Sequence, residues 1–143
     1  MARVIKTESA GKDRNRLSRA VVLAIREFMK QTEPDETSRD LAAFIALALL
    51  EIAQTIDQSV AAWEKRDYWI KADRFRMEWS WAERLGRAME TALIEEDWAT
   101  IAQTAVQIAQ KLSGVRIAER HRLGKPWEGA WEQFQKRKQP RHG

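Results

Sequence analysis

The stretch Leu41–Ala53, with the sequence LAAFIALALLEIA, constrains the fold of this chain more than any other. Twelve of its thirteen residues are apolar, and the exception is Glu51. A helix that is apolar on every side has no face for solvent and must be covered by other elements. Thirteen residues are too few to cross a bilayer, which takes about 20. We therefore expect the central helix of a soluble bundle, with Glu51 partly buried.

Apolar residues recur at helical spacing along most of the chain before Gly114, and Gly and Pro are few. The sequence therefore predicts an all-α fold: an antiparallel helical bundle of four main helices, then a C-terminal extended arm with a short aromatic helix. The four main helices are expected to begin near Asp13 and then to span about 36–62, 68–94 and 98–112.

Capping residues mark the expected helix starts. Asp35, Thr37 and Ser38 all suit the N-cap of the second helix, and Thr37 with Asp40 resembles a capping box. Further along, N-caps are expected at two aspartates, Asp67 for the third helix and Asp97 for the fourth.

The boundary between the second and third helices is the least defined, because no Gly or Pro occurs between Asp35 and Leu85. A turn near Asp67 is the preferred interpretation. The alternative is an unbroken rod over 36–94, roughly 88 Å long. Such a rod would expose the apolar stretch unless partner chains covered it.

The third helix carries the most regular pattern. Spacings of four and three residues alternate through an apolar seam, which predicts packing against a neighbouring helix at a small crossing angle. That seam is Tyr68, Ala72, Phe75, Trp79, Ala82, Gly86, Met89 and Leu93. A second set widens the apolar side: Ile70, Met77, Trp81, Ala88 and Ala92.

After Gly114 the helical period is lost until Pro126, which suits the first position of a short helix. Trp127, Trp131 and Phe134 then share one face. We therefore divide the chain into a flexible basic arm over 1–12, a helical bundle domain over 13–113, and a basic aromatic C-terminal arm over 114–143.

The net charge of +4 is unevenly distributed. Residues 1–30 carry eight Lys/Arg against three Asp/Glu, residues 31–100 eight against fifteen, and residues 101–143 nine against three. Basic ends around an acidic middle favour a polyanionic partner, although basic tails also serve solubility alone. On the first helix Arg16, Arg19, Arg26 and Lys30 share one face. That pattern fits the outer layer of a bundle or a helix lying on a membrane surface.

No motif for a reaction or a cofactor occurs. The chain has no cysteine, no Glu-x-x-His pair, no HExxH and no Gly-rich phosphate loop. We therefore predict no catalytic, cofactor-binding or metal-binding residue, and a protein that is not an enzyme. The first 16 residues lack an apolar signal core, so a cytoplasmic location without membrane attachment is expected.

The functional prediction is a non-enzymatic helical binding or assembly protein, a subunit of a homo-oligomer or larger complex, with nucleic acid as the favoured partner of its basic ends. Trp127, Trp131 and Phe134 are expected to bind a protein partner or to anchor the arm on its own bundle. The alternative function is a helical-bundle enzyme or small-ligand binder with a pocket between helices two and three. The expected nucleic-acid-binding residues are Arg116, Arg120, Arg122, Lys125, Lys136, Arg137 and Lys138.

Overall fold

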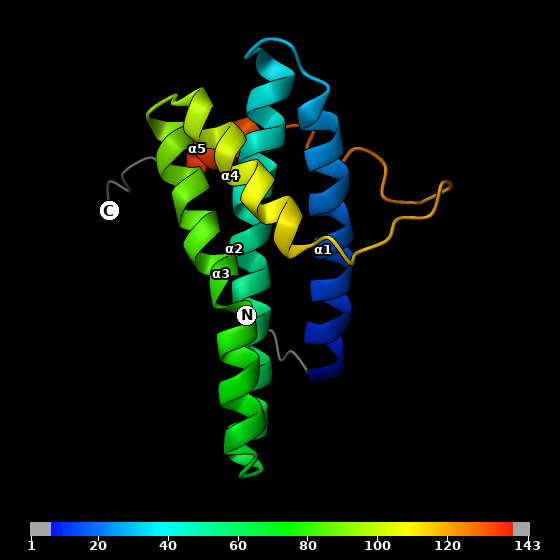
Figure 1. Ribbon diagram of the computed structural model, residues 1–143, viewed down its shortest axis with the longest axis vertical. Helices are drawn as coiled ribbons and strands as arrows, with labels where there is room; N and C mark the ends of the chain where they lie inside the picture. Colours follow the sequence, from blue (N-terminus) through cyan, green and yellow to red (C-terminus); the bar gives the residue numbers. More distant parts are fainter. Residues whose placement is uncertain (1–6, 139–143) are drawn as a thin grey trace.

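The computed structural model describes residues 7–138, in which every regular element is a helix (Figure 1). The predicted all-α bundle is confirmed. The five helices are α1 (Thr7–Met29), α2 (Glu36–Lys65), α3 (Trp69–Ile94), α4 (Trp98–Lys111) and α5 (Ala130–Lys138). None of these helices is both long and apolar enough to cross a membrane.

The N-terminal boundary differs from the prediction. The helix α1 already begins at Thr7, so residues 7–12 belong to the bundle rather than to a basic arm. Residues 1–6, on which the rest of the predicted arm falls, lie outside the described residues.

The helix α2 is the centre of the bundle, as its composition predicts. It packs against α1, α3 and α5, while α4 packs against α3. Its side chains Leu41, Ile45, Leu49 and Ile52 are fully buried. The partly buried position predicted for Glu51 is wrong, because its side chain is exposed. It follows Phe44 and Leu47 on a helix face that is only partly covered.

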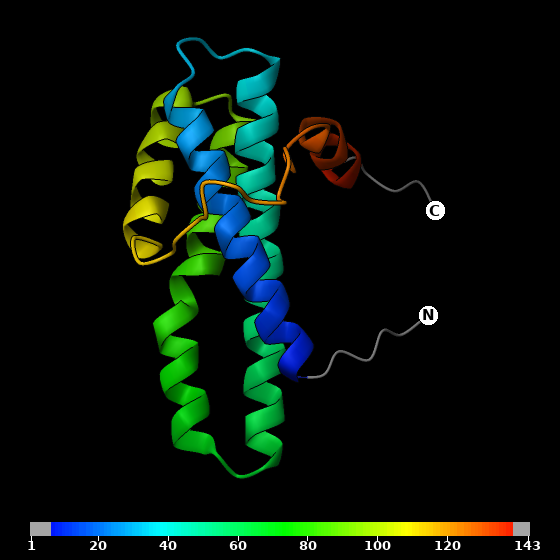
Figure 2. The ribbon, with the colours of Figure 1, turned by 90° about the vertical axis from the view of Figure 1, so that its right-hand side faces the viewer.

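The boundary between α2 and α3 is a tight turn, so the chain forms an antiparallel hairpin and not a rod (Figure 2). Asp67 does not cap α3 as predicted. Its φ of 62° places it in the left-handed region that reverses the chain, and an aspartate tolerates this conformation better than most residues. Tyr68 is the N-cap residue, and its backbone N–H donates to the Trp63 carbonyl at 2.9 Å.

The starts of α2 and α4 are capped by aspartates. Asp35 accepts a hydrogen bond from the Ser38 N–H at 2.9 Å, so the capping box predicted from Thr37 and Asp40 is not formed. Asp97 accepts one from the Thr100 N–H at 3.1 Å, as predicted. These bonds stabilise the ionised carboxylates: the Ser38 N–H lowers the pKa of Asp35, and the Thr100 hydroxyl and N–H lower the pKa of Asp97.

The seam predicted on α3 faces α2 and allows close packing. A Cβ added to Gly86 would lie 3.1 Å from Leu50 Cδ2 and 3.2 Å from Leu49 Cβ. Ala72 and Ala82, the other small residues of the seam, are fully buried. The absence of larger side chains at these positions therefore sets how near α3 approaches α2.

Coverage of the α2–α3 hairpin is uneven along its length. One end lies among α1, α4 and α5, whereas the turn end projects beyond the other helices (Figures 1 and 2). Toward the turn end, Ile56, Val60 and Ala72 form a small buried apolar cluster that is separate from the main core. The side chains of Tyr68, Trp69, Ile70 and Met77 are exposed there.

Candidate nucleic-acid interface

The connection between α4 and α5, residues 112–129, crosses over α1 (Figure 2). This crossing brings arginines together that are about 100 positions apart in the sequence. Arg16 and Arg19 of α1 line a hollow of about 410 Å³ with Arg120 and Arg122 of the connection. The rest of the lining is Ile117, Ala118, His121 and Leu123.

A second hollow of about 470 Å³ continues from Arg19. Arg116 lines it from the connection and Trp79 from α3. Ser18 also contributes to its wall, and the Ser18 hydroxyl is buried without a hydrogen-bond partner. Arg19 lines both hollows, so they adjoin at its side chain. We use "basic groove" for the surface made by Arg16, Arg19, Arg116, Arg120 and Arg122.

The charges of the basic groove are largely uncompensated. Arg16 lies 3.7 Å from the Asp13 carboxylate, and both side chains are largely open to solvent. The other four arginines are exposed and enter no ion pair within the described part of the chain. Several guanidinium groups around one hollow repel each other and favour an anion between them. Planar guanidinium donors also match the geometry of phosphate oxygens.

His121 adds a hydrogen-bond donor to the groove. Its Nδ1 atom accepts a hydrogen bond from the backbone N–H of Leu123 at 3.3 Å. With Nδ1 used as an acceptor, Nε2 is the nitrogen of the ring that is left to donate to a ligand. The imidazole therefore complements the arginines as a contact for an anion.

Arg14 lies nearby but has a different role. Its guanidinium donates to the hydroxyls of Thr55 and Ser59, each at 3.4 Å, and lies 4.7 Å from the centre of the Phe75 ring and 5.9 Å from that of Trp79. Burial lowers the pKa of Arg14. These contacts fix α1 against both helices of the hairpin, so Arg14 supports the groove wall instead of offering a free charge.

The predicted nucleic-acid-binding residues divide into two groups. Arg116, Arg120 and Arg122 lie in the basic groove, whereas Lys125 is exposed and lines neither hollow. Lys136 and Arg137 are exposed on α5, where Lys136 pairs with Glu132 at 3.4 Å. The side chain of Lys138 lies outside the described residues.

The prediction omitted Arg16 and Arg19 from this site. A signal for them was present, because both belong to the basic face of the first helix. That pattern alone does not show which part of the chain crosses the face. Their inclusion therefore depends on the path of the connection over α1.

The residues predicted to bind a partner pack on their own bundle. Trp127 and Phe134 are buried in the main core, with Phe134 2% exposed, so the prediction that they contact another protein is corrected. Trp131 is partly buried and stacks on Phe134 with 5.9 Å between ring centres. Two roles were expected for these aromatics, and the structure shows the one in which they anchor the C-terminal arm on its own bundle.

The start of α5 explains this anchoring. Pro126 is not the first helical residue as predicted, because Gly129 adopts a φ of 78° and the helix begins at Ala130. The carboxylate of Asp40 on α2 accepts hydrogen bonds from the backbone N–H groups of Gly129 at 3.3 Å and Trp131 at 2.9 Å. A side chain of the central helix thus caps the short helix from outside.

A hollow is also present where the alternative function predicts a pocket, between helices two and three. A hollow of about 940 Å³ lies at the turn end of the hairpin, lined by Trp63 of α2 and by residues 67–71, Arg74, Phe75 and Glu78. Two residues of its wall already contact each other, since the Lys71 ammonium lies 4.6 Å from the centre of the Trp63 ring. The described residues contain no group of three or more His, Asp or Glu side chains arranged to hold a metal ion.

Comparison of the chain with protein-family models, curated proteins and solved structures gives no match.

Proposed function

We propose that this protein is a non-enzymatic nucleic-acid-binding protein that uses the basic groove between α1 and the connection. The observation that carries the proposal is the convergence of Arg16, Arg19, Arg120 and Arg122 on one hollow. Phosphate contacts supply most of the affinity in such interfaces, and clustered guanidinium or ammonium groups provide them. The location that goes with this proposal is the cytoplasm.

The groove supports backbone binding more than base reading. Its polar contacts are guanidinium and imidazole donors, which suit phosphate oxygens, and the nearby Trp79 ring is already stacked on Trp81 with 5.6 Å between ring centres. Arg14 lies over the same Trp79 ring. We therefore expect binding that depends strongly on salt and weakly on base sequence.

The test is titration of a labelled oligonucleotide at several salt concentrations. Combined replacement of Arg19, Arg120 and Arg122 by Ala should weaken binding. It should also reduce the slope of log K against log salt by about 2–3, because each lost phosphate contact removes about 0.7–0.9 from the slope. The melting temperature should stay nearly unchanged, since all three side chains are exposed.

A control with the same loss of charge separates the groove from overall charge. Arg66, Arg84 and Lys111 are exposed basic residues outside the groove, and their combined replacement by Ala should retain most of the affinity. If both triple variants weakened binding equally, the loss of affinity would be explained by net charge and not by the groove. No binding by the wild-type protein at low salt would reject the proposal.

The bases of α5 are a secondary candidate contact. Lys136, Arg137 and Lys138 follow each other in the sequence, but no residue of α5 lines either hollow of the groove. Their combined replacement by Ala should cause a smaller loss of affinity than the groove variant. A larger loss would move the main phosphate contacts to α5.

A further inference from the structure

A second exposed surface lies on α3, close to the turn between α2 and α3. Ile70 and Met77 are 74% and 76% exposed, the highest values among the exposed large apolar side chains. They are seven residues, or about two helical turns and roughly 10 Å, apart on one face of α3. Arg74 lies between them on that face and is exposed. We call Ile70, Asp73, Arg74 and Met77 the α3 stripe.

The stripe continues a face that is buried elsewhere in the molecule. Trp81 and Ala92 follow Ile70 and Met77 at helical spacing and are 6% and 3% exposed. They lie in the half of α3 along which α4 folds back (Figure 1). The helix α4 has 14 residues against 26 in α3, so it covers about half the length. The stripe is therefore the part of a helix-packing face that α4 is too short to cover.

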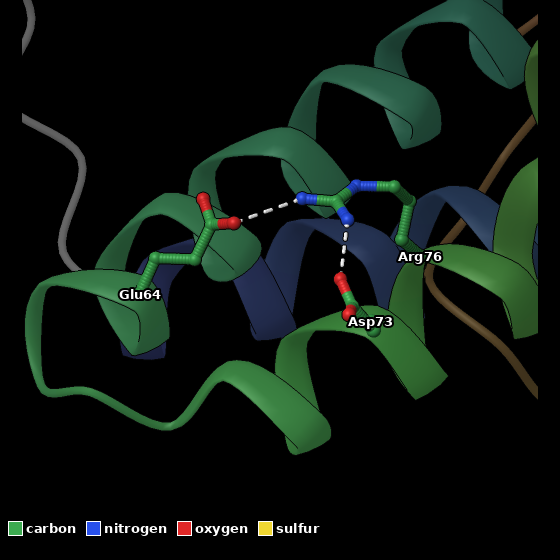
Figure 3. Close-up of polar contacts among 3 residues, drawn as sticks. All are labelled: Glu64, Asp73 and Arg76. Atoms are coloured by element: carbon green, nitrogen blue, oxygen red, sulfur yellow. Dashed lines mark hydrogen bonds and ion pairs between the residues drawn. The ribbon is translucent and has the colours of Figure 1, made fainter.

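Two of the cations beside the stripe, Arg76 and Lys71, are engaged within the chain. Arg76 donates to Glu64 at 3.1 Å and to Asp73 Oδ1 at 2.7 Å, which joins α3 to α2 (Figure 3). Lys71 lies over the Trp63 ring. Arg74 enters no ion pair within the described part of the chain, and no hydrogen bond there engages Asp73 Oδ2. The stripe thus offers the Arg74 guanidinium next to an oxygen of Asp73 that accepts no hydrogen bond, and Glu78 at its edge also enters no ion pair within the described residues.

This arrangement is complementary to itself. If two stripes pack antiparallel about an axis between positions 73 and 74, Ile70 of one chain meets the partner's Met77. In the same register Arg74 meets the partner's Asp73, and each contact occurs twice because a two-fold interface repeats every contact.

We propose that a second copy of this chain covers the α3 stripe in an antiparallel, two-fold dimer. The inference deepens the assembly role expected of this protein and leaves the basic groove free on each copy. Nucleic-acid binding and dimerisation are therefore separable properties.

The experiment is light scattering after size exclusion over a range of protein concentrations. The wild-type chain should form a dimer. Ile70→Glu and Met77→Glu should each raise the dimer dissociation constant about tenfold or more, because each places a carboxylate in the apolar contact. Both side chains are exposed in the monomer, so helicity and melting of the dilute variants should be unchanged.

The matched control is Val106→Glu on α4. Val106 is another exposed apolar residue, 45% exposed, and lies outside the stripe. This variant should dimerise like the wild type. Loss of the dimer in Val106→Glu as well, or its persistence in Met77→Glu, would overturn the assignment of the face.

The register is tested by exchanging charges. Arg74→Asp should weaken the dimer, because it places two carboxylates opposite each other, and the double variant Asp73→Arg with Arg74→Asp should restore much of the affinity. No recovery in the double variant would contradict the antiparallel register. A wild-type chain that is monomeric at every concentration would overturn the dimer and leave a different protein as the occupant.

Oligonucleotide titration of the Met77→Glu variant separates the two proposals. Binding by this monomeric variant with an unchanged salt slope shows that the groove acts without the dimer. A dimer that binds no oligonucleotide would reject the proposed function while the inference on the stripe stands.

Discussion

The two ends of the α2–α3 hairpin are built from similar residues but have opposite environments. At the body end, Leu41, Ile45 and Leu49 of α2 are fully buried and Trp81 of α3 is 6% exposed. At the turn end, Trp69 of the same α3 helix is 54% exposed. The difference arises because α1, α4 and α5 surround only the body end (Figures 1 and 2). Apolar composition therefore shows that a surface needs a cover, whereas the lengths of the neighbouring helices decide whether the chain supplies it.

The largest expected difference in stability is between two single variants, each of which places one charge at one end of α2. Ala48→Asp puts a carboxylate into the fully covered half, where Ala48 is 3% exposed, and should cost about 4 kcal/mol or more. Ala61→Asp makes the same change in the turn half, where Ala61 is exposed, and should cost less than about 0.5 kcal/mol. Thermal and urea unfolding of both variants measure the difference. Similar costs at the two positions would remove the distinction between the ends.

Much of the body end follows from the sequence alone. An apolar stretch with no solvent face predicts the core around Leu41, and the small residues of the seam predict the close approach at Gly86. The capping aspartates Asp35 and Asp97 are likewise local signals, because each accepts a hydrogen bond from a backbone N–H three residues away.

The remaining features depend on contacts between distant parts of the chain. Nothing near Asp40 in the sequence shows that it caps a helix 89–91 residues later. The exposure of Met77 depends on where the covering helix α4 ends. The basic groove required the path of the connection over α1, which brings Arg120 to Arg19. Such contacts leave no periodic pattern in the sequence.

A second comparison uses one residue type on one helix. Trp81→Ala should cost about 3–5 kcal/mol, because it empties a buried volume in the main core. Trp69→Ala removes an exposed ring at the turn end and should cost less than about 1 kcal/mol. Both variants are compared by urea unfolding at low protein concentration, so that self-association does not contribute. A cost above 2 kcal/mol for Trp69→Ala would show that the turn end is packed more tightly than the structure indicates.

The smallest of these effects concerns how α5 completes the body end. Asp40 binds two backbone N–H groups at the start of α5, and a nine-residue helix is marginal without such support. Asp40→Ala should therefore cost about 1–2 kcal/mol, since charge-assisted bonds at a partly exposed site are lost. Asp57→Ala, at an exposed position of the same helix, is the control and should change stability by less than about 0.5 kcal/mol. Hydrogen exchange is the informative measurement, because the loss of Asp40 should lower protection in α5 while α2 and α3 stay protected. Uniform loss of protection in all helices would show instead that α5 and the bundle unfold as one unit, and the anchor would then belong to the core itself.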